Sequence, residues 1–362
     1  MHYFHLSAGA ITALFPKAIS NRSSARLLAT RAVLLFTLLT AFCAGNVALA
    51  ATTEHSIPPP GVPHEQYLGL PASAEGPAID PDKGYRLQKL GEDLYMVTDN
   101  AYQAMFLVYD EGVALVDAPQ SLASVLTKAI SEITENPITH VVYSHSHLDH
   151  IGGVTAIPGK PIIVAHQETR RLLVRSNDSA RPLPTKVFDE SYRLQLGKHR
   201  LELAYHGNGH SPGNTFIYAP AQKTLMVVDI IFPGWIPWRH FALAQDLPGY
   251  FASVEKIKTY DFDVLVSGHV KRTGTRADVN LQSEFLSDIK TVAAEALRTT
   301  KVGDGVSPRD SGNPWAVYDV YMDKVIGKCV AKMTEKWVSR LGGFDVFIWD
   351  HCIAMQESLQ VE

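Results

Sequence analysis

Residues 140–153 read HVVYSHSHLDHIGG and place four of the chain's fifteen histidines within eleven residues. The apolar residues 141–143 lead into them, as at the end of a buried strand. In the extended or loop conformation that follows, His145 and His147 point the same way, because residues two apart share a face. Two imidazoles in that arrangement can bind one metal ion.

The same loop offers donors for a second ion. Asp149 and His150 point away from the first pair and can face another cation. A polar surface loop accounts for a lone His-x-His pair, but not for His-x-His-x-Asp-His between a buried strand and two glycines. Three further donors follow apolar strands later in the chain: His210, Asp229 and His269. The sequence therefore indicates a metal site assembled from several strand ends.

With these residues in this order, the chain resembles the metallo-β-lactamase fold superfamily between about Tyr85 and Arg298. The five motifs of that family are matched here by Asp117, residues 145–150, His210, Asp229 and His269. The resemblance implies a first ion bound by His145, His147 and His210. It implies a second ion bound by Asp149, His150 and His269, with Asp229 bridging both. Asp117 is expected to orient the histidine-rich loop through backbone hydrogen bonds rather than to bind metal.

Mixed imidazole and carboxylate ligands suit Zn²⁺, and we expect two zinc ions per chain, with iron or manganese as other candidates. Two ions roughly 3.5–4 Å apart can hold a hydroxide between them, lower its pKa towards about 7 and polarise a carbonyl. The resemblance therefore implies a metal-dependent hydrolase that cleaves an ester, lactone, thioester or amide bond of a small-molecule substrate. Asp149 and Asp229 are the carboxylates expected to take part in catalysis.

Other activities occur on this fold, so the fold alone does not decide function. A mononuclear iron sulfur dioxygenase shares the histidine-rich motif, but such enzymes are usually compact and not exported. A flavin-linked diiron reductase carries Glu where this chain has His147, and a non-catalytic descendant would usually have lost ligands. A β-lactamase proper with an Asp-His-His second site commonly lacks the bridging carboxylate of Asp229. That carboxylate favours the glyoxalase-II-like and lactonase-like branches.

The segment IIFPGWIPWRH, residues 230–240, directly follows Asp229. Two interpretations are open for Trp235, Trp238 and His240 within it. They line the mouth of the site and contact the substrate, or they pack on a neighbouring helix. The sequence does not separate these interpretations.

The first fifty residues contain four basic residues and no acidic one, followed by a short apolar run and the small-residue site Ala48-Leu49-Ala50. This order predicts a signal peptide cleaved after Ala50, and hence a periplasmic or secreted protein with no stable membrane anchor. Its removal leaves 29 basic and 37 acidic residues, a net charge of −8, which disfavours nucleic acid as a partner. Cys329 and Cys352 remain, and the sequence leaves open whether they pair. It also leaves the oligomeric state open.

The pattern of elements predicts an α/β fold. Hairpins are expected around residues 110–112 and 197–198, with helices after Ser121 and over residues 279–298. We expect an αββα sandwich of two mixed β-sheets flanked by helices, with a helical C-terminal extension. The predicted divisions are a signal peptide (1–50), a Pro/Gly-rich lead-in (51–84), a metallo-β-lactamase-like domain (85–298) and a mostly helical extension (299–362).

Overall fold

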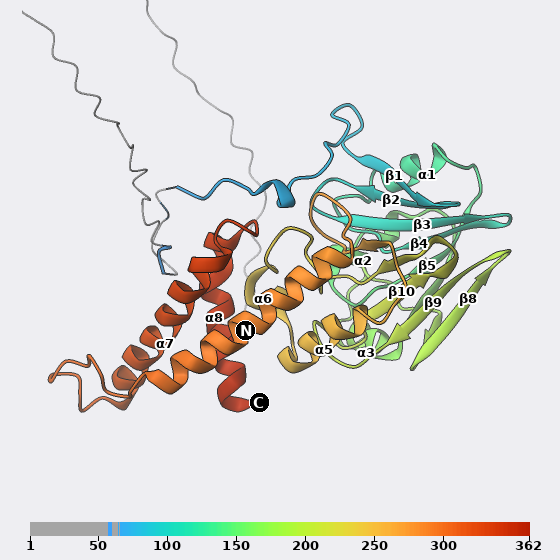
Figure 1. The fold of residues 1–362 in the computed structure, drawn as a ribbon. Coiled ribbons are helices and arrows are strands. Elements are labelled where there is room, and N and C mark those ends of the chain that lie inside the picture. Colours follow the sequence, from blue (N-terminus) through green and yellow to red (C-terminus); the bar gives the residue numbers. More distant parts are fainter. Residues whose placement is uncertain (1–56, 60–63, 65) are drawn as a thin grey trace, which may run out of the picture. The chain divides into compact units, whose positions relative to one another are not determined.

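The structure is a computed structural model that describes residues 57–59, 64 and 66–362 (Figure 1). The predicted signal peptide, residues 1–50, lies outside the described residues. One sheet has seven strands, side by side in the order β1 (Arg86–Gly91), β2 (Leu94–Thr98), β3 (Gln103–Tyr109), β4 (Gly112–Val116), β5 (Ile138–Val142), β6 (Ile162–His166) and β7 (Lys186–Phe188). The other has five, in the order β12 (Val264–Val266), β11 (Thr224–Met226), β10 (Thr215–Ala219), β9 (His199–Tyr205) and β8 (Ser191–Leu196).

Both sheets are mixed. Strands β1 to β4 pair antiparallel, whereas β4 to β7 pair parallel. In the second sheet β12 pairs parallel with β11 and the others pair antiparallel. The two predicted hairpins are confirmed, because Tyr109 pairs with Gly112 and Leu196 pairs with His199. Gly197 adopts a φ of 58° in the second turn, a conformation that glycine permits without strain.

The space between the sheets is filled by every second residue of each strand. On β3, Met105 and Leu107 face this inner layer, while Ala104 and Phe106 face the helices outside. Leu203 of β9 and Ile217 of β10 reach the inner layer from the other sheet. Because side chains alternate along a strand, both faces of the central strands are buried, which explains their nearly continuous apolar sequence.

Helices cover the outer faces. Beside the first sheet lie α1 (Leu126–Ser131), α2 (Leu148–Ile151) and α3 (Gln167–Ser176), and beside the second lie α5 (Leu247–Ile257) and α6 (Arg276–Thr299). The last two helices, α7 (Pro314–Trp337) and α8 (Phe344–Val361), pack against α6 and against each other. The predicted αββα sandwich with a helical C-terminal extension is therefore confirmed. Within the described residues, no helix combines the length and the apolar character needed to cross a bilayer.

The predicted start of the first helix is wrong. Ser121 does not cap it, and α1 begins only at Leu126. The residues before it form successive tight turns instead, with the N–H of Leu122 bonded to the Pro119 carbonyl at 3.0 Å. These turns lie against Gly153, where an added Cβ would come within 2.7 Å of the Ala118 carbonyl oxygen. Close packing against the histidine-rich loop thus replaces the first helical turn.

The C-terminal helices share one hydrophobic core with the second sheet. Trp337 of α7 and Phe344 and Ile348 of α8 are fully buried in the cluster that also contains Phe216 and Leu225 of that sheet. A disulfide joins Cys329 of α7 to Cys352 of α8, with Cα atoms 6.0 Å apart. The extension is therefore packed as part of the sandwich, and the pairing that the sequence left open is present.

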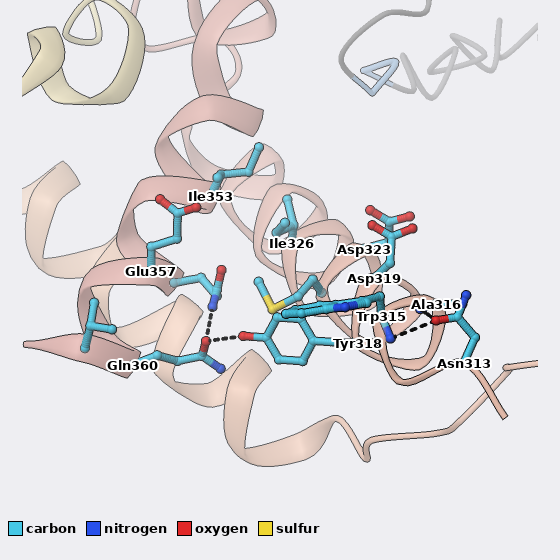
Figure 2. Close-up of a pocket in the computed structure, with 13 residues that line it drawn as sticks. Asn313, Trp315, Ala316, Tyr318, Asp319, Asp323, Ile326, Ile353, Glu357 and Gln360 are labelled. Atoms are coloured by element: carbon cyan, nitrogen blue, oxygen red, sulfur yellow. Dashed lines mark hydrogen bonds between the residues drawn. The ribbon is translucent and has the colours of Figure 1, made fainter. Parts of the chain in front are cut away.

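A cavity of about 930 Å³ separates the outer parts of α7 and α8 (Figure 2). Trp315, Tyr318 and Ile353 are among its lining residues, and Tyr318 donates a hydrogen bond to Gln360 across it at 2.7 Å. All lining residues come from α7, α8 and the residue before α7. None of the predicted metal ligands lines this cavity.

An unusual backbone segment precedes α5. In α4 (Arg239–Leu243), the φ angles of His240, Phe241, Ala242 and Leu243 lie between 51° and 58°, so these four residues form a left-handed turn. An L-residue in this conformation costs roughly 1–2 kcal/mol, and consecutive ones are rare. The surrounding contacts must therefore hold the segment in place.

Removing the disulfide tests how much it contributes to stability. The bond closes a loop with a sequence separation of 23 residues. The double variant Cys329→Ala/Cys352→Ala should therefore lose about 3 kcal/mol of unfolding free energy, through the larger conformational entropy of its unfolded chain. The measurement is urea-induced unfolding. Reduced wild-type protein should show the same loss, and equal stability of oxidised and variant proteins would contradict the prediction.

Candidate metal centre

The predicted ligands meet at one edge of the sandwich because each follows the end of a strand. Residues 145–150 follow β5 in the first sheet, whereas Asp229 and His269 follow β11 and β12 in the second. His210 lies in the loop between β9 and β10. The carboxyl ends of these strands face the same crevice, a usual place for a site in α/β proteins.

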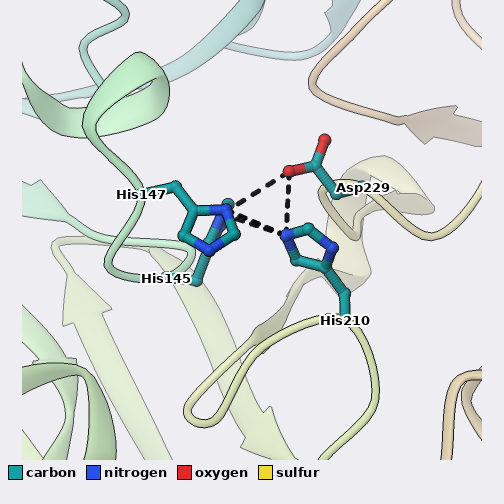
Figure 3. Close-up of side chains that lie close together, drawn as sticks. All are labelled: His145, His147, His210 and Asp229. Atoms are coloured by element: carbon teal, nitrogen blue, oxygen red, sulfur yellow. Dashed lines mark hydrogen bonds and ion pairs between the residues drawn. The ribbon is translucent and has the colours of Figure 1, made fainter. Parts of the chain in front are cut away.

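The first donor group consists of His145, His147, His210 and Asp229 (Figure 3). Its four donor atoms lie within 4.8 Å of one another. His210 Nε2 is 3.4 Å from His145 Nε2 and 3.1 Å from His147 Nδ1. Figure 3 shows the three imidazoles converging on one side of the Asp229 carboxylate.

The second donor group consists of Asp149, His150 and His269. The Nε2 atoms of the two histidines are 3.1 Å apart, and Asp149 Oδ2 lies 3.5 Å from His150 Nε2. Asp149 is exposed to solvent over 45% of its side chain, whereas His150 is fully buried. This group therefore has one side open to an incoming molecule.

Asp229 contacts both groups. Its Oδ2 lies 3.1 Å from His210 Nε2 and 3.2 Å from His150 Nε2, and its Oδ1 lies 2.9 Å from His269 Nε2. The residue has a φ of 63°, which turns its side chain back into the crevice after β11. One carboxylate thus stands between the two sets of imidazoles.

The charges show what the cluster requires. Burial holds the pKa of His145 well below its usual value and lowers that of His147 to about 4, so both imidazoles are neutral ligands at neutral pH. Burial opposes a charge on His150 too, but the neighbouring carboxylates, Asp229 first, outweigh it and raise the pKa of His150 to about 9. Burial also opposes a charge on Asp229, yet His150 and His269 hold its pKa well below the usual range. The buried carboxylate therefore needs positive charge beside it.

The donor set fits divalent cations. Ring nitrogens stand 3.1–3.4 Å apart with their lone pairs converging, an arrangement that a metal ion satisfies better than hydrogen bonds do. His269 donates through Nδ1 to the Ala101 carbonyl at 3.1 Å, which leaves the Nε2 lone pair facing the site. Asp229 Oδ1 is buried and finds no hydrogen-bond partner among the described residues. The cluster is suited to a dinuclear metal site.

Asp117 lies beside the donor groups and not within them. Its Oδ1 accepts a hydrogen bond from the Ser144 N–H at 2.8 Å, at the start of the histidine-rich loop. Its Oδ2 lies 3.9 Å from His150 Nδ1, and burial raises the pKa of Asp117 to about 6. This is the backbone contact that the sequence predicts for Asp117.

Two residues at the start of β3 also shape the site, and the sequence pattern does not mark them: Gln103, the first residue of the strand, and Tyr102 just before it. The Gln103 side chain is fully buried and forms hydrogen bonds with the loop that carries His269. Its Nε2 donates to the Val270 and Arg272 carbonyls, both at 3.0 Å, and its Oε1 accepts from the Ser267 N–H at 3.1 Å. Because β3 and β12 belong to different sheets, Gln103 of the first sheet holds the loop that follows β12 in the second sheet. A single glutamine in a strand gives no sequence signal of this role.

Tyr102 is the second missed residue. Its hydroxyl lies 3.4 Å from Asp149 Oδ2, and its ring is 4.6 Å from that of His269. Burial and the Asp149 carboxylate raise the pKa of Tyr102 to about 12, so the phenol keeps its proton and can donate to Asp149.

The three predicted pocket residues make different contacts. Trp235 donates through Nε1 to the Ala74 carbonyl at 3.0 Å and packs against Gly342, as expected of a structural tryptophan. Trp238 is half exposed and its ring is 6.4 Å from that of Phe347 in α8. His240 Nε2 lies 3.5 Å from an oxygen of Asp350 in the same helix. The packing interpretation thus describes Trp235, whereas Trp238 and His240 lie in a loop that α8 contacts.

A third group with ligand chemistry lies elsewhere, formed by Glu92, Asp93 and His199. Lys198 places its ammonium 2.6 Å from Glu92 and 3.5 Å from Asp93. That ammonium and the buried His199, whose Nε2 lies 2.9 Å from Asp93, already pair with these carboxylates, so the group is explained as an ion-pair network.

Comparisons with known proteins agree with this geometry. The family model described as the metallo-beta-lactamase superfamily matches residues 97–269, which confirms the resemblance. The 2,4-dinitroanisole O-demethylase subunit alpha of Nocardioides sp. (strain JS1661) is 27% identical over 210 residues, covering 57% of this chain and 63% of that protein. The metallo-beta-lactamase type 2 of Bacillus sp. (strain 170) is 25% identical over 151 residues, covering 38% of this chain and 57% of that protein. The chain thus spans less than two thirds of these curated relatives.

Among solved structures, the stereoselective inverting sec-alkylsulfatase Pisa1 from Pseudomonas sp. superimposes with a TM-score of 0.53. The two are 16% identical, and the match covers 76% of this chain and 50% of that one. This likeness shows the fold alone.

Replacing Gln103 tests whether its hydrogen bonds to the His269 loop support metal binding. Gln103→Ala removes three hydrogen bonds to that loop, so the affinity for the ion held by Asp149, His150 and His269 should fall about 10–100-fold. Metal stoichiometry and competition with a chromophoric chelator measure this. The control is Gln356→Ala, because Gln356 is also buried but lies in α8. Equal metal affinity in both variants would contradict the role given to Gln103.

Proposed function

We propose that this chain, whose residues 97–269 match the metallo-beta-lactamase superfamily, is a dinuclear zinc hydrolase that cleaves an ester, lactone, thioester or amide bond. The proposed ligands of the first ion are His145, His147 and His210. Those of the second are Asp149, His150 and His269, and Asp229 serves both. Iron or manganese in place of zinc is an outcome that metal analysis distinguishes.

One observation carries the proposal: the position of the Asp229 carboxylate between the two donor groups. Its Oδ2 contacts His210 of the first group and His150 of the second, and its Oδ1 contacts His269 of the second group. A carboxylate that serves two imidazole groups suits a pair of dications, because it offsets their mutual repulsion. This arrangement supports a hydrolase of the glyoxalase-II-like or lactonase-like kind over a β-lactamase that lacks the bridge.

Divalent cations held by the two donor groups and Asp229 would supply Lewis acidity at this cluster. The chain's own residues direct the rest. Asp149 is half-exposed on the open side of the second donor group, where its carboxylate would hold the ion and face an incoming substrate. Tyr102 fixes the orientation of Asp149 by donating a hydrogen bond to it. Buried Asp117 keeps the histidine-rich loop in register through Ser144.

A second candidate reaction comes from the relative with the name O-demethylase. It shares 27% identity with this chain over 57% of the chain's length, which favours testing cleavage of an aryl methyl ether. β-Lactam hydrolysis is a third possibility, supported by the metallo-beta-lactamase type 2 relatives. The ether, the β-lactam and the acyl substrates differ in leaving group and in the atom attacked, so the rates of their cleavage distinguish the three reactions directly.

We also propose that the protein works outside the cytoplasm, in the periplasm or after secretion. The basic and apolar segment of residues 1–50 supports this proposal. The disulfide between Cys329 and Cys352 supports it independently, because such bonds persist mainly in oxidising compartments. N-terminal sequencing of protein recovered from the periplasm tests it, and an intact Met1 there would oppose cleavage.

The proposed activity is tested with a substrate panel on protein of known metal content. The panel contains lactones, aryl esters, thioesters, amides, a β-lactam and 2,4-dinitroanisole. Metal-free protein should be inactive towards any substrate that the native protein cleaves, and added Zn²⁺ should restore the rate. Turnover by protein shown to be free of metal would refute the mechanism, and restoration by iron alone would refute the assignment of zinc.

The variant Asp229→Asn tests the bridge. The amide keeps the shape of the side chain but removes its negative charge, so it is a poor ligand for two dications. The ion held by Asp149, His150 and His269 should be lost first, because three imidazoles still bind the other ion. Turnover should fall by two or more orders of magnitude, while the melting temperature of the metal-free protein changes little. Two tightly bound ions with normal turnover would show that Asp229 is not the bridge.

A further inference from the structure

The C-terminal helix α8 contacts the loop that runs from Asp229 towards the His210 loop. Asp350 and His351 of α8 are both buried. Their side chains point to the left-handed turn Arg239–Leu243 and to the residues just before it. The proposed hydrolysis makes no use of either residue.

His351 uses both ring nitrogens on this loop. Its Nδ1 accepts a hydrogen bond from the Phe241 N–H at 3.1 Å, and its Nε2 donates to the Pro237 carbonyl at 2.8 Å. The ring also packs against the Phe241 ring, with centroids 4.5 Å apart. Burial lowers the pKa of His351 to about 4, so it is neutral with its proton on Nε2.

Asp350 binds the outer side of the same turn. Its Oδ2 accepts from Arg239 Nε at 2.7 Å, and its Oδ1 lies 3.5 Å from His240 Nε2. Contacts from α8 thus reach Pro237, Arg239, His240 and Phe241. These contacts offset the conformational cost of four consecutive residues with positive φ.

The other end of the turn is tied to the metal centre. The Gln245 N–H is shared between the Gly209 carbonyl at 3.0 Å and the carbonyl of His210, a proposed ligand, at 3.1 Å. The Asp246 N–H donates to Gly209 at 3.0 Å as well. Trp238, among the residues that α8 contacts, and Leu243, two residues before Gln245, expose 50% and 47% of their surface.

We propose that Asp350 and His351 are positioning residues, which hold the left-handed turn so that Trp238 and Leu243 form an apolar wall for the substrate beside the His210 loop. The chemical class that fits this wall is a substrate with an aromatic or alkyl group attached to the bond that is cleaved. The substrate class and the wall rest on the proposed function, whereas the positioning of the turn is independent of it.

Trypsin cleavage after Arg239 tests the positioning without any substrate. A protease needs an extended, mobile segment, and the anchored turn does not provide one. In His351→Leu, cleavage of the bond between Arg239 and His240 should be at least ten-fold faster than in wild type. His351→Gln keeps one donor and one acceptor and should restore resistance. Asp350→Asn, which releases Arg239, should give an intermediate rate.

The matched control is His199→Leu, because His199 is also a buried, hydrogen-bonded histidine but lies on β9. It should cleave after Arg239 at the wild-type rate. Equal cleavage in wild type, His351→Leu and Asp350→Asn would overturn the proposal. So would equal acceleration in His199→Leu, which would indicate general loosening of the fold.

The substrate wall is tested by kinetics on whichever panel substrates the protein cleaves. Trp238→Ala and Leu243→Ala should raise KM at least five-fold for esters with an aryl or long alkyl group. They should leave the metal content at the wild-type value and raise the KM for a methyl ester less than the KM for the aryl and long alkyl esters. An equal change of KM for all esters would overturn the wall. If no substrate is cleaved, the proposed function fails, whereas the trypsin result still decides the positioning.

Discussion

The structure depends on one electrostatic constraint: a buried carboxylate that needs positive charge on two sides. Asp229 lies where the two sheets meet, within 3.2 Å of three imidazoles. Asp229 and its neighbouring carboxylates raise the pKa of His150 to about 9, so this imidazole takes up a proton beside Asp229, whereas burial neutralises His145 and His147. The site thus attracts positive charge, which a pair of dications would supply, because both donor groups offer nitrogen ligands beside the carboxylate. The metal centre and the proposed hydrolysis follow from this one position.

The sandwich makes the position possible. Each sheet contributes ligands at the ends of its strands, so the centre keeps its geometry only while the two sheets keep their relative placement. Gln103 joins the start of β3, in the first sheet, to the His269 loop of the second sheet through three hydrogen bonds. The apolar layer between the sheets holds them in the same relative placement over a larger area. The hydrogen bonds of Gln103 at the site and the apolar packing between the sheets thus both maintain the geometry of the metal centre.

The C-terminal helices extend this support to the proposed substrate side of the centre. They share a core with the second sheet, and the disulfide joins them to each other. Asp350 and His351 reach from α8 to a turn whose far end bonds to the His210 loop. The extension is therefore connected, contact by contact, to one proposed metal ligand. Its position offers a reason for a strained turn that the sandwich alone would not stabilise.

The sequence by itself determined the sheets, the hairpins and the gathering of histidines and aspartates, since alternating apolar residues and strand-end motifs are local signals. The sequence did not determine the local structure or the contacts at places where long-range packing outweighs local preference. Ser121 has the chemistry of a helix cap, yet contact with Gly153 holds turns there. Gln103, Tyr102 and His351 act on residues more than 40 positions away, and no local pattern marks such partners. Only the tertiary structure decided those contacts, because they exist only once both sheets and α8 are in place.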